Sequence, residues 1–194
     1  MLQEILIRNT RLRKLDLTNC SSVSNTSLQV LALNCPDLHT LILYDCHWTS
    51  VEGMMAVALN CRGLEHVDIT GCWCINDDVI ILLALHCKKI QYLSLSKIYG
   101  ITDYSMSIVA KEIPCLRHLN IQGCWRLSDD SVRLLGEYCP NLKALQAKEC
   151  RDVTETSLVR LRVKGVNIDV RPPPKPYRVS NLTNNMNRKL YIQI

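Results

Sequence analysis

The segment LRKLDLTNC at residues 12–20 decides the fold, because its pattern returns five more times along the chain. The equivalent segments are LHTLILYDC (38–46), LEHVDITGC (64–72), IQYLSLSKI (90–98), LRHLNIQGC (116–124) and LKALQAKEC (142–150). Each segment starts 26 residues after the previous one, with no insertion between them. A period of this length is typical of solenoid proteins, in which every repeat is one supersecondary unit that packs on its neighbours.

Each repeat has the pattern of a strand followed by a helix. Leucines alternate with polar residues in the opening segment, as at Leu15 and Leu17, which predicts a strand with one buried face. Twelve residues after each start stands a small polar residue that can cap a helix. These residues are Ser24, Ser50, Asn76, Thr102, Ser128 and Thr154. The sequence therefore predicts an α/β leucine-rich-repeat solenoid, a horseshoe with a concave parallel β-sheet and convex helices.

Acidic residues follow several of these caps and suit the positive end of a helix dipole. They are Asp77, Asp103, Asp129 and Glu155.

The pattern also predicts three parts of the chain. Residues 1–11 are expected to be the remnant of a preceding repeat helix, and residues 12–170 to hold six 26-residue units plus a terminal strand. Residues 171–194 are expected to form a proline-rich basic tail, either flexible or folded back as a cap on the last coil.

Nine of the 11 cysteines recur in two repeat columns, which favours packing over chemistry. Cys20, Cys46, Cys72, Cys124 and Cys150 end the strand segments, and Cys35, Cys61, Cys87 and Cys139 end the helices. No Cys-x2-Cys pair suggests a zinc site, so we expect no metal and no cofactor. Cys74 and Cys115 lie outside the columns and are expected to be the exposed thiols.

Composition and charge exclude several classes of protein. Hydrophobic residues make up 47% and charged residues 21%, and no apolar run reaches the roughly 20 residues of a membrane helix. The net charge is +5, but residues 160–194 carry eight Lys or Arg and one acid, so the basic character belongs to the tail. We therefore expect no membrane partner and no nucleic-acid role. The sequence contains no nucleophile elbow, phosphate loop or metal triad, so we expect no enzymatic activity.

Two surfaces are candidates for protein binding, since strand residues on the concave side point away from the core. The concave candidates are Tyr44, His66, Asp68, Tyr92, His118, Asn120 and Gln122, in which Tyr44, His66, Tyr92 and His118 are expected to form a stripe of rings. The rim candidates are Trp48, Trp73, Tyr99 and Trp125, the last three in a row with His47 and Arg151. The alternatives are ordinary solvated strand residues for the first set and mutual stacking for the second.

The pattern LxxLxLxxC…Cxx at this period resembles the cysteine-containing repeats of the F-box/LRR family, over about residues 1–170. The resemblance implies the substrate-recognition part of an SCF (Skp1–cullin–F-box) E3 ubiquitin ligase, with catalysis in other subunits. The odd number of cysteines and the N-terminus, which does not read as a signal peptide, favour reduced thiols and a cytoplasmic or nuclear location. The run LVRLRVKGVNIDVRPP and the final YIQI are similar to one family member in particular. That closer similarity implies Smurf-type HECT ligases as substrates and a link to BMP signalling.

The sequence departs from that family because no F-box is present, so Skp1 is expected as a partner only if a longer form carries one. The chain is then either a fragment or short form of a receptor, or a free-standing adaptor. In the second case it resembles the Amn-type LRR inhibitors, which have cysteine-containing repeats without an F-box and bind a cell-cycle or signalling regulator.

Overall fold

The computed structural model describes residues 2–21 and 23–172, so the predicted tail lies outside the described residues from position 173 onward. Seven helices alternate with seven strands in this part of the chain. The helices are α1 (Leu2–Arg8), α2 (Asn25–Asn34), α3 (Val51–Asn60), α4 (Asp77–His86), α5 (Asp103–Glu112), α6 (Asp129–Tyr138) and α7 (Glu155–Val163). The strands are β1 (Lys14–Asp16), β2 (Thr40–Ile42), β3 (His66–Asp68), β4 (Tyr92–Ser94), β5 (His118–Asn120), β6 (Ala144–Gln146) and β7 (Asn167–Ile168).

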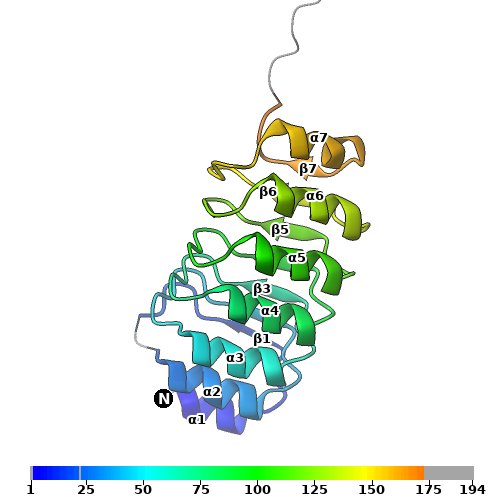
Figure 1. Cartoon of the computed structure of the whole chain (residues 1–194). Helices are drawn as coiled ribbons and strands as arrows, with labels where there is room; N and C mark the ends of the chain where they lie inside the picture. Colours follow the sequence, from blue (N-terminus) through cyan, green and yellow to red (C-terminus); the bar gives the residue numbers. More distant parts are fainter. Residues whose placement is uncertain (1, 22, 173–194) are drawn as a thin grey trace, which may run out of the picture.

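The strands form one parallel sheet in the order β1 to β7, with the helices stacked along the opposite side (Figure 1). Each residue pairs with the one 26 positions later, as Lys14 does with Thr40. The last interval is shorter, because Ala144 pairs with Asn167. Paired strands lie about 4.8 Å apart whereas packed helices need roughly 8–10 Å, so the stack curves with the sheet on the inside. The predicted α/β solenoid with a concave parallel sheet is confirmed.

The core lies between the two layers and repeats with the sequence. Leu41, Val67, Leu93 and Leu119 point inward from the centres of successive strands and are at most 2% exposed. Met54, Ile80, Met106 and Val132 meet them from the helices, all fully buried. Because each coil packs mainly on its two neighbours, the stability of the array is largely a sum of coil and interface contributions. In the described part of the chain, no helix has the length and apolar character needed to cross a bilayer.

All six predicted cap residues stand at helix N-caps, and five of them accept a backbone N–H with their side chains. Ser24 makes no such bond, since its hydroxyl pairs with that of Thr26. The acids that follow do more than face their own helix dipole. Asp103 accepts hydrogen bonds from the backbone N–H and hydroxyl of Ser128, the cap of the next coil, at 2.9 and 2.6 Å.

The same carboxylate bridge joins Asp77 to Thr102 and Asp129 to Thr154. Asn25 repeats half of it by accepting the backbone N–H of Ser50 at 2.7 Å. Glu155 differs, since its carboxylate pairs with Arg162 in the same helix. These inter-coil carboxylate bridges therefore link the starts of neighbouring helices, a role that the dipole interpretation did not include.

The cysteine columns pack as predicted. Of the strand-end thiols, Cys46 donates its S–H to the Leu17 carbonyl of the preceding coil at 2.9 Å, and Cys124 bonds to Leu95 at 3.1 Å. Ile98 and Ile113 fill the column positions that lack cysteine, and both are fully buried. Burial raises the pKa of Cys72 and Cys124 to about 12, which keeps these thiols protonated. Cys74 and Cys115 are exposed, as predicted.

Candidate interaction site

The concave face presents one row of side chains from the first residue of each strand. The parallel register aligns Lys14, Thr40, His66, Tyr92, His118, Ala144 and Asn167. The rings of His66 and Tyr92 stack at 4.0 Å and 4° between planes, and those of Tyr92 and His118 lie 6.3 Å apart at 34°. We call His66, Tyr92 and His118 the ring row. Burial lowers the pKa of His66, although the charge of Asp68 acts to raise it. This end of the row is therefore mainly neutral at pH 7.

Tyr44 does not belong to this row, although the sequence placed it in the same stripe. The register pairs Thr40 with His66, so Tyr44 lies level with Thr70, four residues farther along the strand direction. It is 38% exposed on the same side of the sheet. The structure therefore divides the predicted stripe into a row of three rings and a separate tyrosine.

The centre of the concave face is more closed than the sequence pattern predicts. Thr70, Ser94 and Ser96 stand at outward positions of the alternating strand pattern, but each is at most 5% exposed. The hydroxyls of Thr70 and Ser94 bond to each other at 2.7 Å, and that of Ser96 donates to the Gln122 carbonyl. Short side chains beside larger neighbours are covered and pair locally, so they offer little to a partner.

The predicted polar residues Asp68, Asn120 and Gln122 are half-buried at the strand ends. Asp68 accepts the backbone N–H of Thr70, and Asn120 accepts that of Gln122, each at 3.0 Å. One oxygen of each side chain therefore holds the turn after its strand. The Gln122 amide reaches toward Glu149 at 3.4 Å. These residues are positioned by local hydrogen bonds, which limits the freedom of their side chains.

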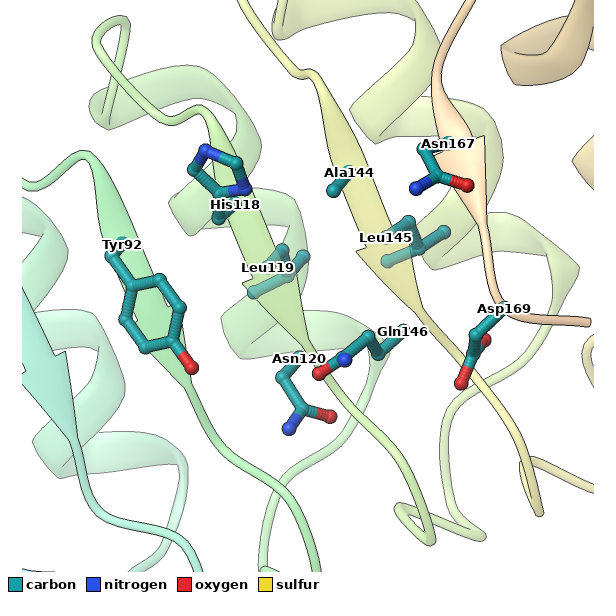
Figure 2. A pocket seen from close by; sticks show the side chains of 9 residues that line it. All are labelled: Tyr92, His118, Leu119, Asn120, Ala144, Leu145, Gln146, Asn167 and Asp169. Carbon is teal, nitrogen blue, oxygen red and sulfur yellow. The ribbon is translucent and has the colours of Figure 1, made fainter.

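A hollow of about 180 Å³ opens at the C-terminal end of the face, over β5, β6 and β7 (Figure 2). We call it the C-terminal hollow. It is lined by Tyr92, His118, Leu119, Asn120, Ala144, Leu145, Gln146, Asn167 and Asp169. Three of these, Tyr92, His118 and Asn120, were predicted site residues. Ala144 and Asp169 were not predicted. The small side chain of Ala144, at the strand position next to His118, could have indicated a gap in this row.

The rim candidates lie where the chain leaves each strand for the next helix. Trp73, Tyr99 and Trp125 are 56%, 44% and 47% exposed. His47 stacks on Trp73 at 4.1 Å, and within the described residues this is the one ring contact along the row. Mutual stacking therefore involves only His47 and Trp73 at one end of the row, and the rings of Trp73, Tyr99 and Trp125 all remain accessible. We call Trp73, Tyr99 and Trp125 the aromatic rim.

Trp48 differs from the other rim candidates. Its side chain is half-buried against the core, and its indole N–H donates to the Cys20 carbonyl of the preceding coil. In the repeat it is equivalent to Cys74 and Arg126, one position after the rim row. The structure thus gives Trp48 a packing role. Over residues 2–21 and 23–172, no three His, Cys, Asp or Glu side chains are arranged to hold a metal ion.

No family model and no curated protein matches this sequence. Among solved structures, the chain is similar to Rad7 in the yeast complex of Rad7 and Elc1, with a TM-score of 0.62 and 18% identity over 82% of this chain and 50% of that one. It is also similar to the tropomodulin C-terminal domain of Caenorhabditis elegans, with a TM-score of 0.52 and 12% identity over 84% of this chain and 90% of that one.

Both similarities concern the fold, which is that of a leucine-rich-repeat solenoid. The chain spans about half the length of the Rad7 chain that it matches. At 18% and 12% identity, these structures assign no role to the side chains of the concave face and the aromatic rim, so those roles are argued from the geometry of this chain.

Proposed function

We propose that this chain is a protein-recognition module of a ubiquitin-ligase complex, which holds a protein substrate while other subunits transfer ubiquitin. The observation that carries the proposal is the aromatic rim, where three large rings on consecutive coils are each at least 44% exposed. Tryptophan and tyrosine are enriched at interface hot spots, and rows of exposed rings mark interaction surfaces. The ring row offers further rings at the starts of the same strands, each seven residues before a residue of the aromatic rim.

The ligase context rests on the resemblance of the cysteine-containing repeats to the F-box/LRR family. The fold shared with Rad7, which was solved in complex with Elc1, supports a role in a protein assembly. In finer detail, we propose an SCF-type receptor similar to F-box and leucine-rich-repeat protein fifteen, with Smurf-type HECT ligases as substrates and a role in BMP signalling. Skp1 would bind only a longer form that carries an F-box. We assign no catalytic step to this chain and place it in the cytoplasm or nucleus.

Affinity capture from cell extract tests the interaction surface. We expect the variant Trp73→Ala/Tyr99→Ala/Trp125→Ala to lose the substrate proteins that the wild type retains. Tyr104→Ala/Tyr138→Ala is the matched control, because it removes two exposed rings, 66% and 43% accessible, from the helical side. Circular dichroism checks that both variants fold. An unchanged set of partners on the rim variant would contradict the assignment of this surface.

A Skp1 pull-down tests the ligase context separately. We expect Skp1 and cullin to bind a form extended upstream by an F-box, and substrates to become ubiquitinated in its presence. If no longer form binds Skp1, the SCF assignment is wrong. Capture of a cell-cycle or signalling regulator without ligase subunits would instead favour the F-box-less adaptor.

A further inference from the structure

We propose that the C-terminal hollow is a recognition pocket for the guanidinium group of a partner's arginine side chain. The inference rests on the proposed function, since it requires that a partner protein reaches the concave face. It adds the chemical class of one residue in that partner. The argument follows from the charge, the hydrogen-bonding groups and the ring geometry of the lining.

The lining offers hydrogen-bond acceptors that nothing else in the described chain uses. Asp169 is its one carboxylate; one oxygen accepts the backbone N–H of Ala147 at 2.8 Å, and the other accepts no hydrogen bond from the described residues. The side-chain amides of Gln146 and Asn167 also make no hydrogen bond within residues 2–21 and 23–172. No lysine or arginine lines the hollow. A cationic donor group therefore fits its charge and its acceptors.

Two rings of the ring row, Tyr92 and His118, line one side of the pocket. His66, Tyr92 and His118 follow one another across three strands, and Ala144 takes the next place with only a methyl group. Figure 2 shows His118, Ala144 and Asn167 along one level of the sheet and Asn120, Gln146 and Asp169 along the next. Leu119 and Leu145 also line the hollow, but their side chains point into the core and are at most 2% exposed, so the strands themselves form its floor. A planar group placed over Ala144 would continue the row against His118.

Arginine satisfies these features together better than other side chains. Its guanidinium is planar, stacks on aromatic faces and has five N–H donors in a fixed fork. A lysine ammonium would supply the positive charge but no planar group to stack on a ring. A phenylalanine would leave the amides and the carboxylate without partners, which costs free energy. A carboxylate would face Asp169 and be repelled. The volume of about 180 Å³ limits the pocket to one side chain.

Nuclear magnetic resonance of the full 15N-labelled chain tests the pocket with defined peptides. The probes are acetyl-Gly-Arg-Gly-amide and the same peptide with Lys, Phe or Glu at the centre. We expect saturable shifts of the amides of Asn120, Ala144, Leu145 and Asp169, and at least tenfold tighter binding of the arginine peptide than of the lysine peptide. Asp169→Asn keeps an acceptor for Ala147 and should weaken binding about tenfold. Ala144→Leu should abolish binding by filling the hollow.

Asp152→Asn is the control, because it removes one exposed negative charge outside the lining and should leave the affinity unchanged. Equal affinity for the arginine and lysine peptides, shifts confined to other coils, or full affinity in Ala144→Leu would each overturn the proposal. So would nuclear Overhauser contacts that place residues 173–194 of the same chain over Ala144. These peptide outcomes concern the pocket alone, whereas the capture experiment above tests the interaction function itself.

Discussion

Removing the Asp103 carboxylate should weaken one interface of the array more than removing any exposed carboxylate. Asp103 begins α5, and its two oxygens accept the backbone N–H and the hydroxyl of Ser128 and the hydroxyl of Ser131, all from the next coil. Ser131 is fully buried. In Asp103→Ala these three donors lose their acceptor, and the Ser131 hydroxyl cannot turn to water.

The expected loss follows from the number and kind of these hydrogen bonds. A hydrogen bond to a charged group contributes about 1.5–3 kcal/mol net, and a buried unpaired group costs about 1–3 kcal/mol. Because Asp103 is itself half-buried and the three bonds share one carboxylate, their contributions do not add fully. We expect Asp103→Ala to lower the free energy of unfolding by about 2–4 kcal/mol, and Asp103→Asn by about half as much because one acceptor oxygen remains.

Urea unfolding, followed by circular dichroism and tryptophan fluorescence, measures both variants. Asp130→Ala is the control, since Asp130 also lies in the first turn of a helix but its side chain is 69% exposed and pairs only with Arg133 in the described structure. An exposed pair of this kind contributes about 0–1 kcal/mol. If Asp103→Ala and Asp130→Ala lose the same stability, the inter-coil carboxylate bridge does not stabilise the array and the reasoning is refuted.

Acid titration gives an independent test of the same bridge. Burial raises the pKa of Asp103, but the hydrogen bonds from Ser128 and Ser131 outweigh it, and the pKa lies below its ordinary value. The stabilisation is therefore complete above the pKa of the unfolded chain, about 3.9, and is lost as the pH falls through the lower folded pKa. Hence the difference in stability between the wild type and Asp103→Asn should shrink below pH 4; a constant difference would contradict the charged bridge.

Three further predictions concern the turns and the thiols. The buried Thr49 hydroxyl has no hydrogen-bond partner among the described N and O atoms, although its contact with Cys72 acts to lower the pKa of that thiol, which burial raises more strongly. Thr49→Val should therefore stabilise the chain by about 1 kcal/mol in urea unfolding. A loss of stability would show that the contact with sulfur dominates. Lys97 and Gly123 occupy the same turn position in neighbouring repeats, with φ of 58° and 72°. Lys97→Gly should raise the free energy of unfolding and Gly123→Ala should lower it, each by about 1 kcal/mol. Changes of stability in the same direction would exclude backbone strain as the cause. With a thiol reagent at pH 8, Cys74 and Cys115 should react first and the buried columns only after unfolding, and Cys74→Ser/Cys115→Ser should remove the fast phase; fast labelling of Cys72 or Cys124 would contradict the burial of the columns.

One period of 26 residues was enough to predict most of the fold. A solenoid repeats its environment, so a residue type that recurs at one position reports the burial of that position. This is why the cap residues and the cysteine columns were predicted correctly from spacing alone. Tyr44 was placed wrongly for the opposite reason: its ring suggested a likeness to His66, whereas the register aligns it with Thr70.

The features that the sequence missed depend on distances between coils. The pattern placed Asp103 in the first turn of a helix, but it contained no information on whether the carboxylate faces its own backbone or the cap of the next coil. The C-terminal hollow depends on Asp169, which lies beyond the six regular repeats. Its distance from Gln146 is 23 residues and not 26, so the period could not align it with the earlier strands.

The position of Asp169 depends on how the last coil closes. The strand β7 pairs with β6 through only two residues, Asn167 and Ile168, so the sheet alone holds the end of the array weakly. The side chain of Arg162 in α7 adds a second attachment: it pairs with Glu155 through two nitrogens and donates to the Val170 carbonyl. Val170 directly follows Asp169, so this contact fixes the backbone beside the carboxylate. Recognition in the C-terminal hollow therefore depends on the packing of α7 as much as on the residues that line the pocket.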